Sequence, residues 1–425
     1  MLKSKGHSLR RVAPKHASAR ISRSTTFPDK LECMPALPTS VPQSTIFFEN
    51  WRAAAQNQNQ GFLEGYECPL YSDAWIVGEE SIGPYHFINT IAHASGPFRG
   101  SVAPVMVLRV GLHVEFTRPR MDRTDTSTYH GGSLSDEVAA LAALALGARV
   151  EAGPTTREFE QSDPRGRPVA HYGYTAPVLP YDERGPKLPW AAGRHSLEDL
   201  RWLGDWFDAN PKDQVALIRA ARLYQEAIWV GDAEPALAWL LLVSAIETAA
   251  DRWDHARLPA VDRLRDSKPV LVQAVEERCP DLLKTIADEL ADTIGATRKF
   301  VAFTLKFLPP PPNDRPAEGF RFPWDSEDFS HALRTIYKYR SKALHTGVPF
   351  PAPMCEPPRK LDINWAGPTE MPLGLASSTL GGVWLRKDTP FLLHIFEYVT
   401  RRVLQAWWSS LRTRQQGIAE AVARE

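Results

Sequence analysis

Two patterns of hydrophobic positions divide this chain into an N-terminal part with strands and a C-terminal part with helices. Up to about residue 153, β-branched and aromatic residues form short runs, and in residues 105–116 apolar and polar side chains alternate, as in a half-buried strand. One helix interrupts these runs, with Ser133 as its predicted N-cap and Gly147 as its predicted end. Mixed strands and a single helix indicate a compact α+β domain. The expected strands are residues 75–77, 85–91 and 105–116, with one or two more around 149–159.

After a stretch rich in proline and glycine, residues 161–194, the apolar positions recur at helical spacing. Asn210 followed by Pro211 is typical of a helix start, and the apolar run 235–246 predicts a buried helix that is too short to cross a membrane. The expected helices are residues 197–207, 212–230, 234–252, two or three within 259–308, then 325–344 and 388–414, with a Pro-rich loop at 348–373. The predicted fold is therefore an α+β N-terminal domain, residues 45–195 including the linker, followed by an all-α helical-bundle domain, residues 196–425.

Composition adds a basic tail and an expected compartment. The chain has 425 residues, of which 43% are hydrophobic and 24% charged, and its formal net charge is zero, so the whole molecule shows no bias toward nucleic acid. Residues 1–44 are rich in Ser, Pro and Arg without periodicity, which predicts a disordered basic tail. The four cysteines fit neither a metal site nor a disulfide framework, and no secretory signal is evident, so a cytoplasmic location without a membrane span is expected.

The most informative stretch is the helix expected at residues 325–344. Its apolar face holds Phe329, Leu333, Ile336 and Arg340. Burying an arginine in an apolar stripe costs free energy unless the guanidinium has an ion-pair partner or serves a function. Because Thr346-Gly347-Val348-Pro349 is a helix terminator, the helix is expected to end near Leu344, which would place His345 at the helix exit beside Arg340.

Glu247 is the expected partner of Arg340. It shares a helical face with apolar residues of the 234–252 helix, whose other faces are apolar too, so its carboxylate is predicted to be buried and to need a cation. Glu247 could orient Arg340 within a functional site, or the two could form a structural ion pair that keeps two helices in register.

The segment Arg340-Ser341-Lys342-Ala343-Leu344-His345 resembles the motif of the HEPN superfamily, in which ribonuclease members share an arginine, four to six residues and then a histidine. Together with Tyr339 before it and Thr346-Gly347 after it, the segment is most similar to the Apea-like HEPN branch associated with phage defence. The resemblance covers roughly the last half of the chain. It implies a helical domain that dimerises, with Arg340 and His345 as catalytic residues and Glu247 and Ser341 in supporting positions.

Arginine and histidine also suit metal-independent RNA cleavage on chemical grounds. The reaction needs a base for the ribose 2′-hydroxyl, an acid for the leaving 5′-oxygen, and positive charge for the phosphorane. Histidine can serve as base or acid, and arginine binds phosphate oxygens while staying charged. Since one histidine cannot easily make both proton transfers, a homodimer that joins two motifs is expected, and no cofactor or metal is required. Ser341 could help to hold the phosphate or could be a neutral surface residue.

Other candidate sites have simpler explanations. The basic stripe opposite Arg340 could follow an RNA backbone or could be a solvated face; it consists of His331, Arg334, Lys338 and Lys342. Gly131-Gly132-Ser133 could bind an anion, but a capped helix is favoured. His86 and His93 lack partners at metal-ligand spacing, so no metal site is expected. Trp407 and Trp408 are expected in a core or dimer interface rather than in a base-stacking platform.

Three hypotheses follow for function. The first is a dimeric HEPN endoribonuclease in phage defence or toxin-like RNA cleavage, whose 45–195 region senses an unknown trigger or restrains the nuclease. The second is a non-catalytic HEPN module that binds nucleotide or RNA, or that serves dimerisation. The third is a purely structural interaction protein whose apolar helices build a dimer.

Overall fold

The structure is a computed structural model of the chain, and it describes residues 43–57, 61–89, 101–115, 123–171, 173–179, 184–204, 209–254, 259–290, 295–379 and 381–422. Residues Ser40–Glu425 form one compact unit. Nearly all of the basic tail predicted at residues 1–44 lies outside the described residues. The coarse fold prediction is confirmed, because an α+β region with an antiparallel sheet precedes a helical region.

The α+β region is built on one antiparallel sheet in the order β3-β4-β5-β1-β7-β8, with β6 also paired to β1. The alternation predicted for residues 105–116 is present only in part: Leu108 and Val110 are buried and Arg109 between them is exposed, but β5 ends at Leu112. A separate parallel pair joins β2 to β9. The strands are β1 (Glu64–Ser72), β2 (Trp75–Val77), β3 (Glu80–Ile82), β4 (Tyr85–Asn89), β5 (Ala103–Leu112), β6 (Glu151–Ala152), β7 (Arg157–Glu160), β8 (Asp163–Pro168) and β9 (Arg194–Ser196).

Two helices belong to this region, α1 (Ile46–Gln56) and α2 (Leu134–Leu146). α2 confirms the predicted boundaries: the Ser133 hydroxyl accepts from the Asp136 backbone, and Gly147 adopts the left-handed conformation that ends the helix. α1 corrects the sequence prediction, which placed strands from residue 45. Its N-cap residue Thr45 makes no side-chain cap; instead the backbone N–H of Phe47 donates to Glu137 of α2 at 2.6 Å. The helix start is thus fixed by a distant residue.

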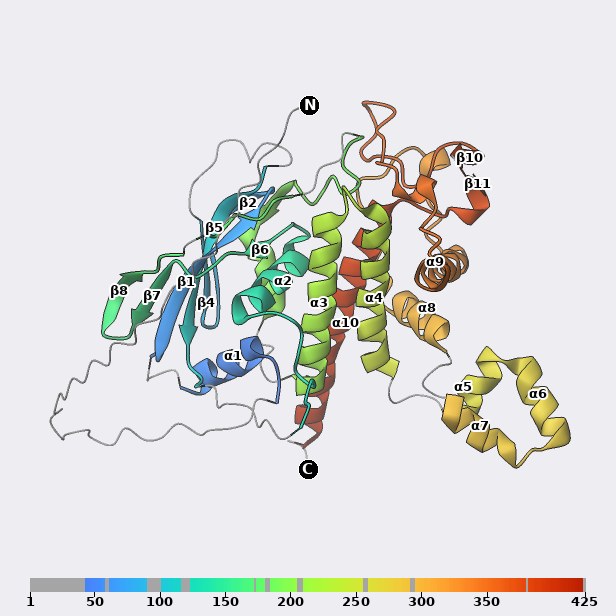
Figure 1. Ribbon diagram of the computed structural model, residues 1–425, viewed down its shortest axis with the longest axis horizontal. Coiled ribbons are helices and arrows are strands. Elements are labelled where there is room, and N and C mark those ends of the chain that lie inside the picture. Colours follow the sequence, from blue (N-terminus) through green and yellow to red (C-terminus); the bar gives the residue numbers. More distant parts are fainter. Residues whose placement is uncertain are drawn as a thin grey trace, which may run out of the picture. The chain divides into compact units, whose positions relative to one another are not determined.

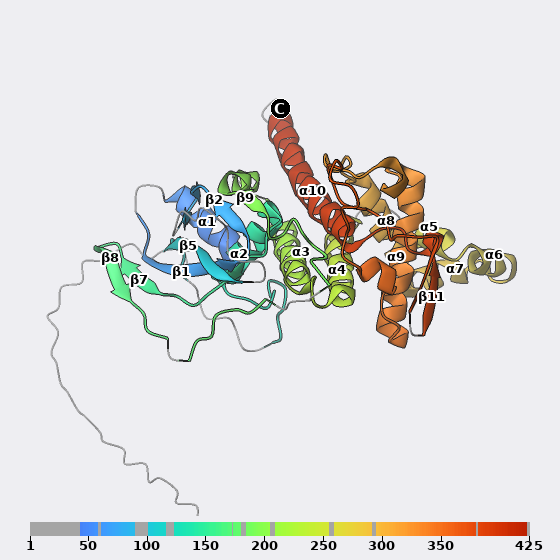
Figure 2. The same ribbon diagram turned by 90° about the horizontal axis from the view of Figure 1, so that it is seen from above.

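The helical region is layered against the α+β region (Figures 1 and 2). α2 packs against α3 (Pro211–Val230), α3 against α4 (Pro235–Asp254), α4 against α8 (Ala296–Lys306), and α8 against α9 (Ser326–Thr346). The last helix, α10 (Leu393–Val422), packs against both α3 and α4. Because the layers are continuous, one hydrophobic core extends on both sides of the predicted division at residue 195.

Trp239 lies at the centre of the helical layers. Its ring is fully buried and stacks on Phe396 of α10, with ring centroids 4.8 Å apart, and on Phe350 at 5.4 Å. Its indole N–H donates to the carbonyl of Met354 at 3.3 Å, so the segment after α9 is tied to α4. Trp407 and Trp408 are buried in the same core, which confirms the core alternative for these residues.

One buried arginine joins the two regions. Arg149 is 1% exposed, and its guanidinium donates to Asp73 at 2.7 Å, to Asp232 at 2.8 Å and to the carbonyl of Ile228 at 2.7 Å. Burial raises the pKa of Asp73, and Arg149 opposes that shift. Asp73 follows β1, and Asp232 follows the end of α3. The triad of Arg149, Asp73 and Asp232 therefore connects the sheet to the helices.

Several remaining boundaries differ from the predictions. Four helices, not two or three, occupy residues 259–308: α5 (Ala260–Ser267), α6 (Pro269–Arg278), α7 (Leu282–Leu290) and α8. The first three have a small core of their own, formed by Leu264, Val272, Leu283 and Ala287. The linker predicted at 161–194 contains β8, and residues 376–385 form the hairpin of β10 (Ala376–Thr379) and β11 (Gly382–Leu385). The short 3-10 helices are η1 (Leu197–Leu203), η3 (Glu318–Phe320), η4 (Ala352–Cys355) and η5 (Arg386–Asp388). Within the described residues, no helix combines the length and the hydropathy that a membrane crossing requires.

Candidate functional site

The candidate site lies on α9, whose ends are set by its own sequence. The Asp325 side chain caps the N-terminus by accepting from the backbone N–H of Glu327 at 3.0 Å and of Asp328 at 2.9 Å. Gly347 closes the other end with φ +68°. The predicted apolar face is confirmed by the burial of Phe329, Leu333 and Ile336.

Arg340 pairs with Glu247 of α4, as the sequence predicted. A terminal nitrogen of Arg340 lies 2.8 Å from Oε2 of Glu247, and the hydroxyl of Tyr337 donates to Oε1 of the same carboxylate at 2.7 Å. The guanidinium also lies over the Tyr337 ring, 5.5 Å from its centroid. Glu247 therefore holds two side chains of α9, and burial together with the bond to Glu247 raises the pKa of Tyr337.

The pair is only half-buried, which corrects the prediction that the Glu247 carboxylate is buried. The Arg340 side chain is 22% exposed and the Glu247 side chain 19% exposed. The Nε atom of Arg340 is buried and has no hydrogen-bond partner among the described residues. The arginine is thus fixed through one nitrogen and its stacking on Tyr337, while donor capacity remains for an anion.

His345 is not where the sequence placed it. α9 continues through Thr346, whose hydroxyl donates to the carbonyl of Lys342 at 2.7 Å, so His345 lies within the last helical turn rather than after it. It lies five helical positions after Arg340, which corresponds to about 7.5 Å along the axis and about 140° around it. His345 is exposed and forms no hydrogen bond or ion pair with the residues that the structure describes. Within one chain, Arg340 and His345 therefore do not converge.

The other predicted residues of α9 lie on its open side. Arg334, Lys338 and Lys342 are exposed, as expected for either interpretation of the basic stripe, and Ser341 is half-buried next to Arg340 in the chain. The Nε atom of Arg334 makes a long contact of 3.5 Å to the Ser330 hydroxyl. Positive charge is thus available to a phosphate backbone along this face.

Tyr337 is the site residue that the sequence interpretation missed. It is placed one helical turn before Arg340, at a spacing that brings two side chains to the same face. That spacing was the available signal, because a tyrosine beside a predicted Glu–Arg pair can donate its hydroxyl to the carboxylate.

One candidate site outside α9 is resolved in favour of its simpler explanation. At the start of α2, the backbone N–H of Ser133 donates to Asp136 at 2.7 Å, so the chain's own carboxylate occupies the place where an anion would bind. His86 contacts the Ser81 hydroxyl at 2.8 Å on the strand pair β3–β4. His93 lies outside the described residues.

A cavity of about 590 Å³ along α10 was not expected from the sequence. It is lined by His394, Glu397 and Arg401, among others, and Glu397 is engaged by Arg401 at 3.0 Å and by the Tyr224 hydroxyl at 2.6 Å. His394 is 3% exposed, and its Nδ1 atom has no hydrogen-bond partner in the described part of the chain. Burial lowers the pKa of His394 to about 3, so this imidazole is neutral at physiological pH.

Comparisons of the chain with protein-family models, with curated proteins and with solved structures found no match. Function is therefore inferred from the residues around Arg340 and from the motif that contains them. The arrangement offers a fixed cation with unused donors, an exposed imidazole one and a half turns away, and an exposed basic face on the same helix. These groups can bind and polarise a phosphodiester without a metal ion.

Proposed function

We propose that this protein is a metal-independent endoribonuclease of the HEPN type that acts as a homodimer. Arg340 binds the scissile phosphate and stabilises the charge of the phosphorane, and His345 transfers protons as base or acid. Glu247 and Tyr337 hold the guanidinium in position. The cellular role that fits such an activity is phage defence or toxin-like RNA cleavage.

The observation that carries the proposal is the state of Arg340. A structural ion pair is normally closed on its partner, whereas the Arg340 side chain is 22% exposed and is held through a single contact to Glu247, and its buried Nε atom has no hydrogen-bond partner among the described residues. A positioned cation whose side chain is partly exposed matches the requirement for binding a transition-state anion.

A second copy of the chain supplies what one copy lacks. His345 points away from the Arg340 of its own helix, so productive contact requires the Arg340 and His345 of two copies to share one site. Two exposed apolar side chains flank His345, Leu344 at 53% and Val348 at 51% exposure. Apolar residues on either side of an exposed histidine are suited to burial against a partner.

The test is RNA cleavage in excess EDTA by the wild type and by His345→Ala. The matched control is His171→Ala, which removes another exposed histidine that lies outside both the motif and the basic stripe of α9. We expect cleavage by the wild type and by the control, with 2′,3′-cyclic phosphate ends, and a loss of at least about 100-fold in His345→Ala. Equal cleavage by His345→Ala, at equal dimer content by light scattering, would refute the role of His345.

The second candidate is a HEPN module that binds RNA without cutting it. It is favoured by one specific observation, the failure of Arg340 and His345 to converge within a chain, together with the exposed stripe of Arg334, Lys338 and Lys342. This alternative expects RNA binding that weakens on Lys338→Ala or Lys342→Ala, with a reduced salt dependence, and no turnover by any form of the protein.

A further inference from the structure

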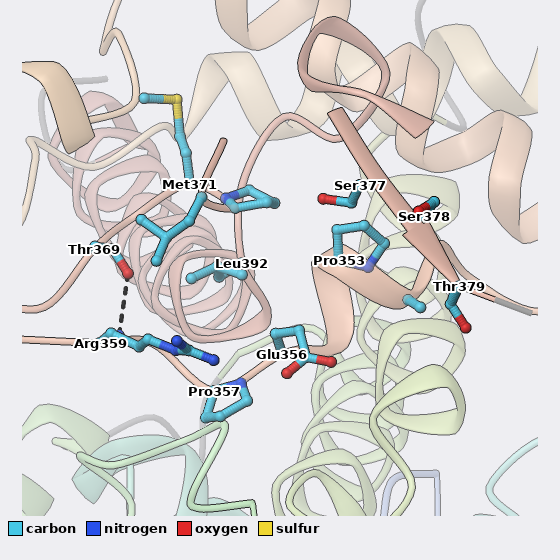
Figure 3. A pocket seen from close by; sticks show the side chains of 13 residues that line it. Pro353, Glu356, Pro357, Arg359, Thr369, Met371, Ser377, Ser378, Thr379 and Leu392 are labelled. Atoms are coloured by element: carbon cyan, nitrogen blue, oxygen red, sulfur yellow. Dashed lines mark hydrogen bonds between the residues drawn. The ribbon is translucent and has the colours of Figure 1, made fainter. Parts of the chain in front are cut away.

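A small cavity lies in the segment that follows α9. Its volume is about 240 Å³, and the residues lining it come from four stretches: η4 and the turn after it, the Thr369–Leu373 stretch, strand β10, and the residue before α10. Figure 3 shows Arg359 and Ser377 projecting into the hollow from opposite sides. The backbone N–H of Arg359 donates to the hydroxyl of Thr369 at 3.1 Å, which fixes one wall to the next.

This cavity is close to the candidate site in both sequence and space. Ala352, the first lining residue, lies seven positions after His345, so their Cα atoms are at most about 25 Å apart. The segment after β11 contacts α9: the Tyr339 hydroxyl donates to the carbonyl of Asp388 at 2.7 Å. A bound RNA strand that crosses the end of α9 would need only a few nucleotides to reach the cavity.

The lining combines flat apolar surfaces with polar groups at the edge. Pro353, Met371 and Leu392 supply apolar walls. Ser377 and Thr379 of β10 supply hydroxyls that can donate or accept hydrogen bonds. An unstacked nucleobase has apolar faces and a rim of donors and acceptors, so its chemistry is complementary to this lining.

Size and charge favour the same occupant. Pockets for drug-sized ligands are usually about 300–1,000 Å³, so a hollow of 240 Å³ suits a single ring system better than a complete larger ligand. Arg359 and Lys360 are exposed at its edge, whereas the acidic lining residue Glu356 pairs with Arg184 at 3.6 Å. Uncompensated positive charge beside the hollow attracts the phosphate attached to the base, and a guanidinium plane can stack on the base.

We propose that this cavity is a specificity pocket that takes one unstacked base of the RNA bound along α9. This inference rests on the proposed function, because it assigns to the same RNA a second contact beyond the cleavage site. It predicts that cleavage positions are selected by the identity of one base at a fixed offset from the cut. The hydroxyls of Ser377 and Thr379 would read that base by hydrogen bonds.

The test uses the full chain and an RNA of randomised sequence, with cleavage ends read by sequencing. Ser377→Phe fills the hollow from β10. Its matched control is Val383→Phe, which adds the same ring at a 73% exposed position of β11 that does not line the cavity. We expect a preference of about tenfold or more at one position in the wild type and in the control. Ser377→Phe should reduce that preference to less than threefold while RNA is still cut.

The outcomes separate this inference from the proposed function. Cleavage by the wild type without base preference, or with a preference that Ser377→Phe leaves unchanged, overturns the pocket and keeps the ribonuclease. If the wild type cuts no RNA, the ribonuclease proposal fails, and binding of 12-mer oligo(A), oligo(C) and oligo(U) by fluorescence anisotropy becomes the test. A fivefold or greater loss of affinity for one oligomer in Ser377→Phe, absent in Val383→Phe, would support the pocket; equal affinities, or no binding at all, would overturn it.

Discussion

Replacing Arg340 by methionine separates a functional arginine from a structural one. Methionine keeps much of the apolar stem but removes the cation that pairs with Glu247 at 2.8 Å. Glu247 would retain the hydroxyl of Tyr337 as a donor at 2.7 Å, so its carboxylate would not be left without a partner. The substitution therefore removes one charged contact from a network that keeps its other member.

The structure sets the expected loss of stability between two regimes. Exposed ion pairs contribute about 0–1 kcal/mol, whereas removing one partner of a fully buried pair costs about 3–5 kcal/mol. Both side chains here are about one-fifth exposed, at 22% and 19%, so solvent screens the pair and a loss of about 1–2 kcal/mol is expected. The fold should survive such a loss. Cleavage should fall much further, by about 10²–10³-fold, if Arg340 stabilises the phosphorane.

Glu247→Gln provides the matched variant, because it disrupts the same pair but leaves the guanidinium in the site. Its stability loss should be similar, and its cleavage rate should lie between those of the wild type and Arg340→Met. The assays are urea unfolding, followed by tryptophan fluorescence, and initial rates on a fluorescent RNA in EDTA. Two results would refute the reasoning: wild-type cleavage by a folded Arg340→Met, or rate losses in both variants that merely follow the fraction of unfolded protein.

Two further predictions concern stability. Arg149→Met leaves Asp73 and Asp232 without their shared buried cation and should lower the free energy of unfolding by about 3–5 kcal/mol in urea titrations; a change below about 1 kcal/mol would show that the triad is not a buried charge network. Burial lowers the pKa of His394 from its ordinary 6.5 to about 3, so below pH 6.5 the unfolded chain binds a proton that the folded chain does not bind. The contribution of the neutral imidazole to the free energy of unfolding is therefore present above pH 6.5 and is lost as the pH falls. Relative to His394→Gln, the free energy of unfolding of the wild type should fall by about 2 kcal/mol between pH 7 and pH 5, measured by unfolding at each pH. The exposed His331→Gln is the matched substitution. Parallel pH profiles for the wild type and His394→Gln would contradict the assignment of a buried neutral imidazole.

Several helices could be predicted from the sequence because their signals are local. Ser133 and Gly147 bound α2, Asn210 caps α3, and Asp325 and Gly347 bound α9, each through contacts within a few residues. The pairing of Arg340 with Glu247 was also predictable. Each residue lies on an apolar face of its own helix, and a charge in such a place needs a partner of opposite sign.

The tertiary structure decided the features that depend on distant residues. α1 is a helix although its own cap is weak, because Glu137, about ninety residues later, accepts from its first backbone N–H groups. Three more features follow from packing between separate elements: how far Glu247 is buried, the hydrogen bond that Tyr337 donates to it, and the cavity in the segment after α9.

For the candidate site, the sequence by itself identified the candidate residues, and the tertiary structure decided which way they face. The spacing of Arg340 and His345 is a fact of the sequence, but their relative direction changes by a large angle if the helix ends two residues earlier, before His345. Helix propensity does not fix that boundary within two residues, whereas the Gly347 conformation and the Thr346–Lys342 hydrogen bond do.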